Sequence, residues 1–127
     1  MTHLLDRNIF NLSGGERQLL ACAVVQVAHH KLIILDEPSS NLDFTTIEKL
    51  KKMIHQWKRQ GKTIIIAEHR LYYLMDLVDR FIVMSDGQMI EEYDAEAFNR
   101  LPQTAVAQLG LRAVSYTHLT LPTIYTV

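Results

Sequence analysis

Asp36 and Glu37 are adjacent carboxylates that directly follow the apolar run Leu32–Leu35. Beside a polyphosphate, Asp36 could hold Mg²⁺, directly or through water, while Glu37 polarises a water molecule for attack on a γ-phosphate. The alternative is a buried strand that simply ends in two polar residues. The pair alone does not decide between a magnesium-dependent site and a strand end.

Ser13, Gly14, Gly15 and Glu16 stand where a helix is predicted to begin. Each glycine gives up about 1 kcal/mol of helix propensity relative to alanine, so two in the first turn favour close access to bare backbone N–H groups. The first N–H groups of a helix lack partners within the helix and suit a phosphate. Ser13 with Glu16 three residues later is also a capping box, which would begin any helix. Both interpretations fit this motif.

His69 comes directly after Glu68 and a second apolar run, Thr63–Ala67. Its imidazole could donate a hydrogen bond to a γ-phosphate and sense whether that phosphate is present, or it could be a polar cap after a strand. Asp43 is an adequate N-cap for the helix that follows it and requires no further role.

Amphipathic and apolar segments alternate along the chain. Helices are predicted from Gly14 to about Ala28 and from Phe44 to about Gln60, and Gly61 ends the second. The runs Leu32–Leu35 and Thr63–Ala67 lack polar alternation, so we expect strands inside the sheet, the first of them buried on both faces. The apolar stripes expected to face the core are Leu19, Leu20, Ala23, Val24 and Val27 in the first helix, and Ile47, Leu50, Ile54 and Trp57 in the second.

Shorter elements are predicted in the second half of the chain. They are a helix at Leu71–Leu77, strands at Phe81–Met84 and Met89–Tyr93 joined by an Asp86-Gly87 turn, and helical segments near Ala95–Arg100 and Thr104–Leu109. Buried strands that alternate with amphipathic helices indicate an α/β fold with a mostly parallel sheet flanked by helices. Such sheets bind ligands at the carboxyl ends of their strands, where both Asp36-Glu37 and Glu68-His69 fall.

Length and charge restrict the classes of function. A chain of 127 residues with 48% hydrophobic content forms one domain or part of one. The formal net charge of -1 gives no electrostatic case for nucleic acid. The basic residues that do cluster are expected to form the solvated face of one helix: Lys49, Lys51, Lys52, Lys58 and Arg59.

A single cysteine, Cys22, allows no internal disulfide, favours a reducing compartment and is expected to be a small buried thiol. No apolar run is long enough to span a bilayer, so membrane association would go through a partner. His29 and His30 are adjacent and diverge on a helix, so we predict no metal-ligand cluster there.

Four motifs occur in an ordered set that resembles the ATP-binding cassette ATPases: LSGGERQ at Leu12–Gln18, Asp36-Glu37-Pro38 after a buried strand, Ser40–Asp43, and His69 after a second strand. In that family the corresponding elements are the signature motif, the Walker B strand with its catalytic glutamate, the D-loop and the switch histidine. The resemblance implies ATP and Mg²⁺ as cofactors and an α/β fold of the P-loop NTPase type.

The resemblance also implies a division of roles between two cassettes. The signature residues Ser13, Gly14, Gly15 and Glu16 would serve ATP bound mainly by an opposing cassette, with Ser13 and Gly15 in contact with its γ-phosphate. Asp36, Glu37 and His69 would act on the cassette's own nucleotide. Ser40 and Asp43 belong to the D-loop, and Asp43 would cross the interface between the two cassettes.

Within the family, three segments resemble the corresponding segments of energy-coupling factor importers for vitamins and cobalt-type metal ions: Asp6–Asn11, Ser39–Asp43 and Ala67–Leu74. Many of these importers carry two cassettes in one chain. The resemblance covers residues 1–112. It implies a second cassette and transmembrane transporter subunits as partners, no nucleic acid, no direct membrane insertion, and a cytoplasmic location on the inner face of the membrane. The alternatives are a soluble cassette with mechanical or regulatory work, and a short protein that binds a complete cassette.

A phosphate loop of the form G-x-x-x-x-G-K-[ST] is missing, because Gly61-Lys62-Thr63 is preceded by a predicted helix. We therefore interpret residues 1–112 as the C-terminal portion of a cassette, with Met1 an internal or artificial start. Alone it is expected not to hydrolyse ATP, and its incomplete sheet is expected to make it poorly soluble.

Residues 113–127 resemble no part of the family. Ser115–Thr123 looks like a translated adapter sequence, and Thr117, Thr120, Thr123 and Thr126 recur at every third position. We interpret this segment as a non-native tail that is extended or disordered and carries no site.

Overall fold

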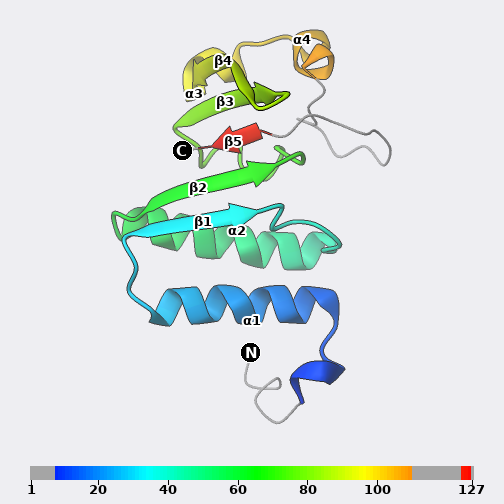
Figure 1. The fold of residues 1–127 in the computed structure, drawn as a ribbon, viewed down its shortest axis with the longest axis vertical. Coiled ribbons are helices and arrows are strands. Elements are labelled where there is room, and N and C mark those ends of the chain that lie inside the picture. The colour runs from blue at the N-terminus through cyan, green and yellow to red at the C-terminus, as the bar shows by residue number, and fades with distance from the viewer. Residues whose placement is uncertain (1–7, 110–123, 127) are drawn as a thin grey trace.

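The structure is a computed structural model that describes residues 8–109 and 124–126 (Figure 1). Its helices are η2 (Ile9–Asn11), α1 (Gly14–Val27), α2 (Phe44–Arg59), α3 (Ala95–Asn99) and α4 (Gln103–Gln108). Its strands are β1 (Leu32–Asp36), β2 (Thr63–Glu68), β3 (Arg80–Ser85), β4 (Gln88–Asp94) and β5 (Ile124–Thr126). No helix in this part of the chain is both long and apolar enough to cross a membrane.

One sheet contains the described strands in the order β1-β2-β5-β3-β4. β1 and β2 are parallel, in register from Leu32 opposite Thr63 to Asp36 opposite Ala67. The other three neighbouring pairs are antiparallel. The α/β class is confirmed, but the expectation of a mostly parallel sheet is wrong for these strands. β1, β2 and β3 run in the same direction, but β5 lies between β2 and β3 and runs opposite to both, and β4 returns from β3 as a hairpin.

The hairpin turn is the one that the sequence predicts. Asp86 and Gly87 both have positive φ, 49° and 74°. Two such residues give the turn whose twist matches that of paired antiparallel strands. The helical segments expected after the hairpin are confirmed as α3 and α4.

Helix α2 supplies the centre of the core. All the residues of its predicted stripe are buried: Ile47, Leu50, Ile54 and Trp57. The indole Nε1 of Trp57 donates to the side-chain oxygen of Gln26, which joins α2 to α1. The rings of Phe81 on β3 and Phe98 on α3 stack with their centroids 3.9 Å apart.

The expected stripe of α1 is only partly correct. Leu19 and Cys22 are buried, whereas Val24 is 63% exposed and Val27 is 74% exposed. Burial raises the pKa of the Cys22 thiol, which keeps it protonated. Helix α1 packs mainly against α2. Its apolar residues that point away from α2 therefore stay at the surface.

Strand β1 is not buried on both faces, contrary to expectation. Ile33 and Leu35 lie in the core, but Leu32 is 50% exposed and Ile34 is 68% exposed. The described elements cover one face of this edge strand and leave the other open. The described residues therefore bury only half of the side chains in this continuous apolar run.

The helix expected at Leu71–Leu77 is also wrong. This segment is a series of turns in which the N–H of Leu74 donates to Leu71 O and the N–H of Leu77 donates to Leu74 O. Leu71, Tyr73 and Leu74 are all buried. Side chains this close in sequence point into the core in several directions, which a regular helical face does not permit.

The carboxyl-terminal segment is described only at β5, where Ile124–Thr126 pairs with both β2 and β3. The interpretation of residues 113–127 as a non-native tail stays a prediction. Residues 113–123 and 127 lie outside the described residues, as do residues 1–7.

Candidate active site

The chain turns sharply where β1 ends. Asp36 is the last residue of the strand, and Glu37 follows with a φ of 43°. A positive φ is uncommon for a residue with a Cβ, and such conformations concentrate at functional sites. The N–H of Glu37 donates to Ala67 O at 2.8 Å, which fixes this turn against the end of β2. The two predicted acidic positions therefore separate, with Asp36 on the strand and Glu37 in the loop.

Glu37 and His69 meet across the carboxyl ends of β1 and β2. The distance between Glu37 Oε1 and His69 Nε2 is 2.8 Å, and both side chains are partly exposed. An imidazole that donates to a carboxylate orients it, and this is how a general base is held toward a water molecule. The convergence expected for the two strand ends is present in the structure.

The start of α1 contains the complete capping box. Ser13 Oγ accepts from the N–H of Glu16 at 3.1 Å, and Glu16 Oε2 accepts from the N–H of Ser13 at 2.8 Å. The two interpretations of this motif are compatible, because a hydroxyl that accepts one hydrogen bond can still donate its own proton to another group. The cap therefore does not use up the binding capacity of Ser13.

The two glycines of this motif have different surroundings. A Cβ built on Gly14 would meet no atom of the chain within 4 Å, whereas one on Gly15 would lie 3.4 Å from the side chain of Leu42 and 3.6 Å from that of Thr46. Packing inside the chain thus gives a reason for a small residue at Gly15. At Gly14 it gives none, which leaves a bare backbone facing open space.

A hollow of about 530 Å³ joins three of the predicted motifs. It is lined by Gly14, Gln18, Asp36, Glu37, Ser40 and Asn41. The start of α1, the acidic pair and the loop before α2 thus share one open surface. His69 reaches this surface through its contact with Glu37.

The donor set of this hollow fits a magnesium ion that keeps water and phosphate ligands. Mg²⁺ in nucleotide sites needs only one or two protein carboxylates, and Asp36 offers one. Among the residues that the structure describes, no group of three His, Cys, Asp or Glu side chains could enclose a metal ion. With Asp36 as its protein ligand, such an ion would also need oxygen ligands from a nucleotide and water.

Asp43 caps α2. One of its carboxylate oxygens accepts from the N–H of Thr46 at 2.7 Å. Hydrogen bonds from Thr46 lower the pKa of Asp43 below its ordinary value. Ser40, its partner in the predicted D-loop, donates its N–H to Glu37 O at 3.0 Å, so this loop is attached to the acidic turn.

Glu68 was placed by its sequence position at the ligand-binding edge of the sheet but was given no role. It is the last residue of β2 and is only 2% exposed. A carboxylate at the end of an apolar strand was visible in the sequence, but its contacts with distant residues were not.

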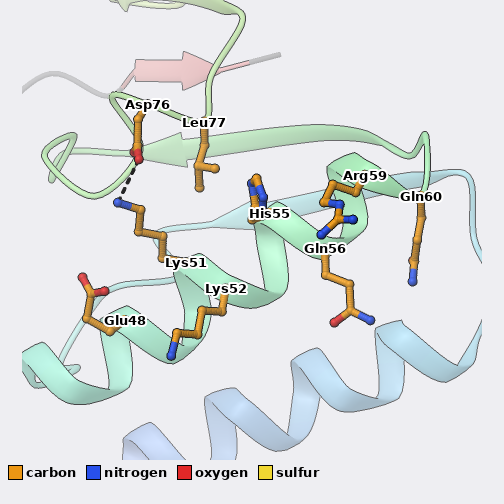
Figure 2. A pocket seen from close by; sticks show the side chains of 9 residues that line it. All are labelled: Glu48, Lys51, Lys52, His55, Gln56, Arg59, Gln60, Asp76 and Leu77. Carbon is orange, nitrogen blue, oxygen red and sulfur yellow. Dashed lines mark ion pairs between the residues drawn. The ribbon is translucent and has the colours of Figure 1, made fainter.

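A larger cavity of about 860 Å³ lies along the exposed side of α2 (Figure 2). Its walls are long charged and polar side chains, and Lys51 pairs there with Asp76 at 3.1 Å. None of the predicted site residues lines it. Three of its lining residues are basic, Lys51, Lys52 and Arg59, and belong to the helix face that is expected to be solvated.

Comparisons with known proteins agree with this arrangement. The family model for ABC transporters matches residues 1–40. A putative ABC transporter ATP-binding protein of Treponema denticola is 47% identical over 110 residues, which cover 87% of this chain and 22% of that protein. The structure of cbiO1 from Clostridium perfringens, part of the ABC transporter complex cbiONQ, has a TM-score of 0.66 and 30% identity over 87% of this chain and 44% of its own. The ADP conformation of MJ1267, an ATP-binding cassette of an ABC transporter, has a TM-score of 0.70 and 28% identity over 86% of this chain and 44% of its own.

The likeness to these solved cassettes shows that the α/β sheet, with carboxylates at its strand ends beside a glycine-bearing helix start, has the fold of the P-loop NTPase class. Within that class, the chain belongs to the ATP-binding cassettes of ABC transporters. It spans less than half the length of each of the relatives described above.

Proposed function

We propose that this chain is part of the ATP-binding subunit of an ABC transporter, in which ATP hydrolysis drives transport across a membrane. The observation that carries the proposal is the 2.8 Å contact between Glu37 and His69 beside the hollow that also contains Gly14 and Asp36. A helix start with a bare glycine can accept a phosphate, and carboxylates beside it can hold the magnesium ion of a nucleotide.

In the proposed reaction, Glu37 accepts a proton from the attacking water, and His69 holds the Glu37 carboxylate in position. Asp36 is the residue that would hold Mg²⁺, which neutralises charge on the phosphate oxygens when bound. Ser13, Gly14, Gly15 and Glu16 would present the start of α1 to a nucleotide carried by a second cassette. Ser40 and Asp43 would lie at the interface between the two cassettes.

The transporter type that we propose is an energy-coupling factor importer. The support is the motif resemblance at Ser39–Asp43 and Ala67–Leu74 and the similarity to cbiO1. Transmembrane subunits would be the partners, and the chain would work at the cytoplasmic face of the membrane. Residues 1–112 would form the C-terminal portion of the cassette, and residues 113–127 would be a non-native tail.

The test is Glu37→Gln in a complete cassette that joins this chain to a P-loop half. We expect ATP binding to be retained and hydrolysis to fall about 100-fold or more, because the amide cannot accept the proton. Glu91→Gln, the same change at an exposed position on β4, is the matched control. Hydrolysis at the parent rate in the Glu37 variant would refute the proposal.

A further inference from the structure

Glu68 is a buried carboxylate whose two oxygens both have donors. Oε2 accepts from the hydroxyl of Tyr73 at 2.8 Å and from the N–H of Ser39 at 3.2 Å. Oε1 accepts from the N–H of His69 at 2.9 Å and from the N–H of Arg70 at 3.2 Å. Four donors from two separate loops therefore converge on one side chain.

Burial of a carboxylate costs free energy unless both of its oxygens accept hydrogen bonds. A buried charge is tolerated only where hydrogen bonds replace the lost water, and a carboxylate without them destabilises its surroundings. Tyr73 is a dependable donor here, because burial and the charge of Glu68 hold the pKa of its hydroxyl far above the ordinary range. All the donors that face Glu68 thus remain protonated at neutral pH.

The two loops that Glu68 joins are those that carry the reacting pair. Ser39 lies two residues after Glu37, and His69 is the residue next to Glu68. The guanidinium of Arg70 makes a second link, since Nη1 donates to Ser39 O at 3.4 Å. A shift of either loop would therefore change the distance between Glu37 and His69.

We infer that Glu68 is a positioning residue that sets the contact between Glu37 and His69 by fixing the backbones of both loops. Tyr73 holds Glu68 in place from the buried side. The effect on catalysis rests on the proposed function, whereas the effect on geometry does not.

Glu68→Gln is the variant that tests this inference, because an amide has nearly the same shape but only one oxygen, so that one pair of donors loses its acceptor. Tyr73→Phe is a milder change that removes a single donor and keeps the ring. Glu91→Gln and Tyr93→Phe are the matched controls, on β4 and away from both loops.

The first readout is the imidazole ¹⁵N spectrum of the chain itself, with His69 assigned by its loss in His69→Gln. We expect Glu37→Gln to shift the His69 Nε2 resonance of the parent, because the two side chains are in contact. In the Glu68→Gln background we expect this shift to be reduced at least about twofold, as coupled residues require. Tyr73→Phe should reduce it in the same direction, and neither control should reduce it. Should Glu68→Gln fail to fold, Tyr73→Phe decides the question.

The second readout is steady-state ATP hydrolysis by the complete cassette. We expect kcat of Glu68→Gln to fall about tenfold or more with KM for ATP nearly unchanged, because misplacement affects the reacting pair and not the nucleotide site. An unchanged response of His69 to Glu37→Gln in both variants overturns the inference. Undiminished hydrolysis in Glu37→Gln overturns the proposed function instead, so the two failures are distinguishable.

Discussion

Gly14 is a residue whose lack of a side chain matters for the proposed function but not for the stability of the fold. It begins α1, yet the space beside its Cα is empty, so nothing in the fold requires a glycine there. Gly61 is different, because its φ of 76° lies in the region that residues with a Cβ avoid. The two positions therefore predict opposite responses to alanine.

Gly14→Ala should leave the unfolding free energy of the chain unchanged or raise it by up to about 1 kcal/mol, since alanine favours the helix. In the complete pair of cassettes the same change should reduce ATP hydrolysis, because the added methyl group blocks the approach of a phosphate. Urea unfolding followed by circular dichroism and a phosphate-release assay are the measurements. Gly61→Ala is the control and should destabilise the chain. A Gly14→Ala protein with full hydrolysis would show that the bare backbone has no role in binding.

At the scale of elements, α2 is held at its start by Asp43 and along its length by its buried stripe. The pKa of Asp43 in the folded chain lies below its unfolded value, through hydrogen bonds from Thr46. The stabilisation is therefore present above the unfolded pKa and is lost as pH falls through the lowered folded pKa.

Asp43→Asn keeps a side chain that caps helices well but does not titrate. We expect the difference in unfolding free energy between the parent and this variant to be constant from about pH 7 to 5 and to change in favour of the variant below about pH 4, where a free aspartate protonates. Chemical unfolding at a series of pH values measures it. A difference that stays constant to pH 3 would mean that the charge of Asp43 does not stabilise α2.

Elements stabilised by contacts between residues close in sequence could be predicted, whereas those stabilised by distant contacts could not. The stripe of α2 was predictable because its four buried residues recur at helical spacing, and the Asp86-Gly87 turn because its chemistry is local. The turns at Leu71–Leu77 were not, because burial from several directions overrides local spacing. That the segments of Glu37 and His69 meet followed from two parallel strand ends. The link from Glu68 to Ser39 did not, because Ser39 lies in a loop 29 residues away in sequence.

At the scale of the whole molecule, the exposed face of β1 is the surface that we expect to cause self-association. Ile34 is 68% exposed on an edge strand, and its neighbour Ile33 is 3% exposed on the opposite face. An exposed apolar edge strand favours association with other chains. The adjacent isoleucines thus allow the two faces to be tested separately.

Ile34→Thr should reduce self-association of the chain, with a change in unfolding free energy within about 0.5 kcal/mol, because a surface position loses little. Ile33→Thr, the control, should cost about 1–3 kcal/mol, because it places a hydroxyl in the core. Sedimentation velocity and urea unfolding measure the two effects. Equal association of the parent and the Ile34 variant would show that this face does not drive aggregation.

The most direct test of the central claim is a double-mutant cycle on hydrolysis in the complete cassette, with Glu37→Gln, His69→Ala and both changes together. Residues that act as one catalytic unit are not additive in their effects on kcat. We predict that the double variant is hardly slower than Glu37→Gln alone, because His69 acts through the carboxylate that it holds. A double variant whose loss in kcat is the product of the two single losses would contradict the account.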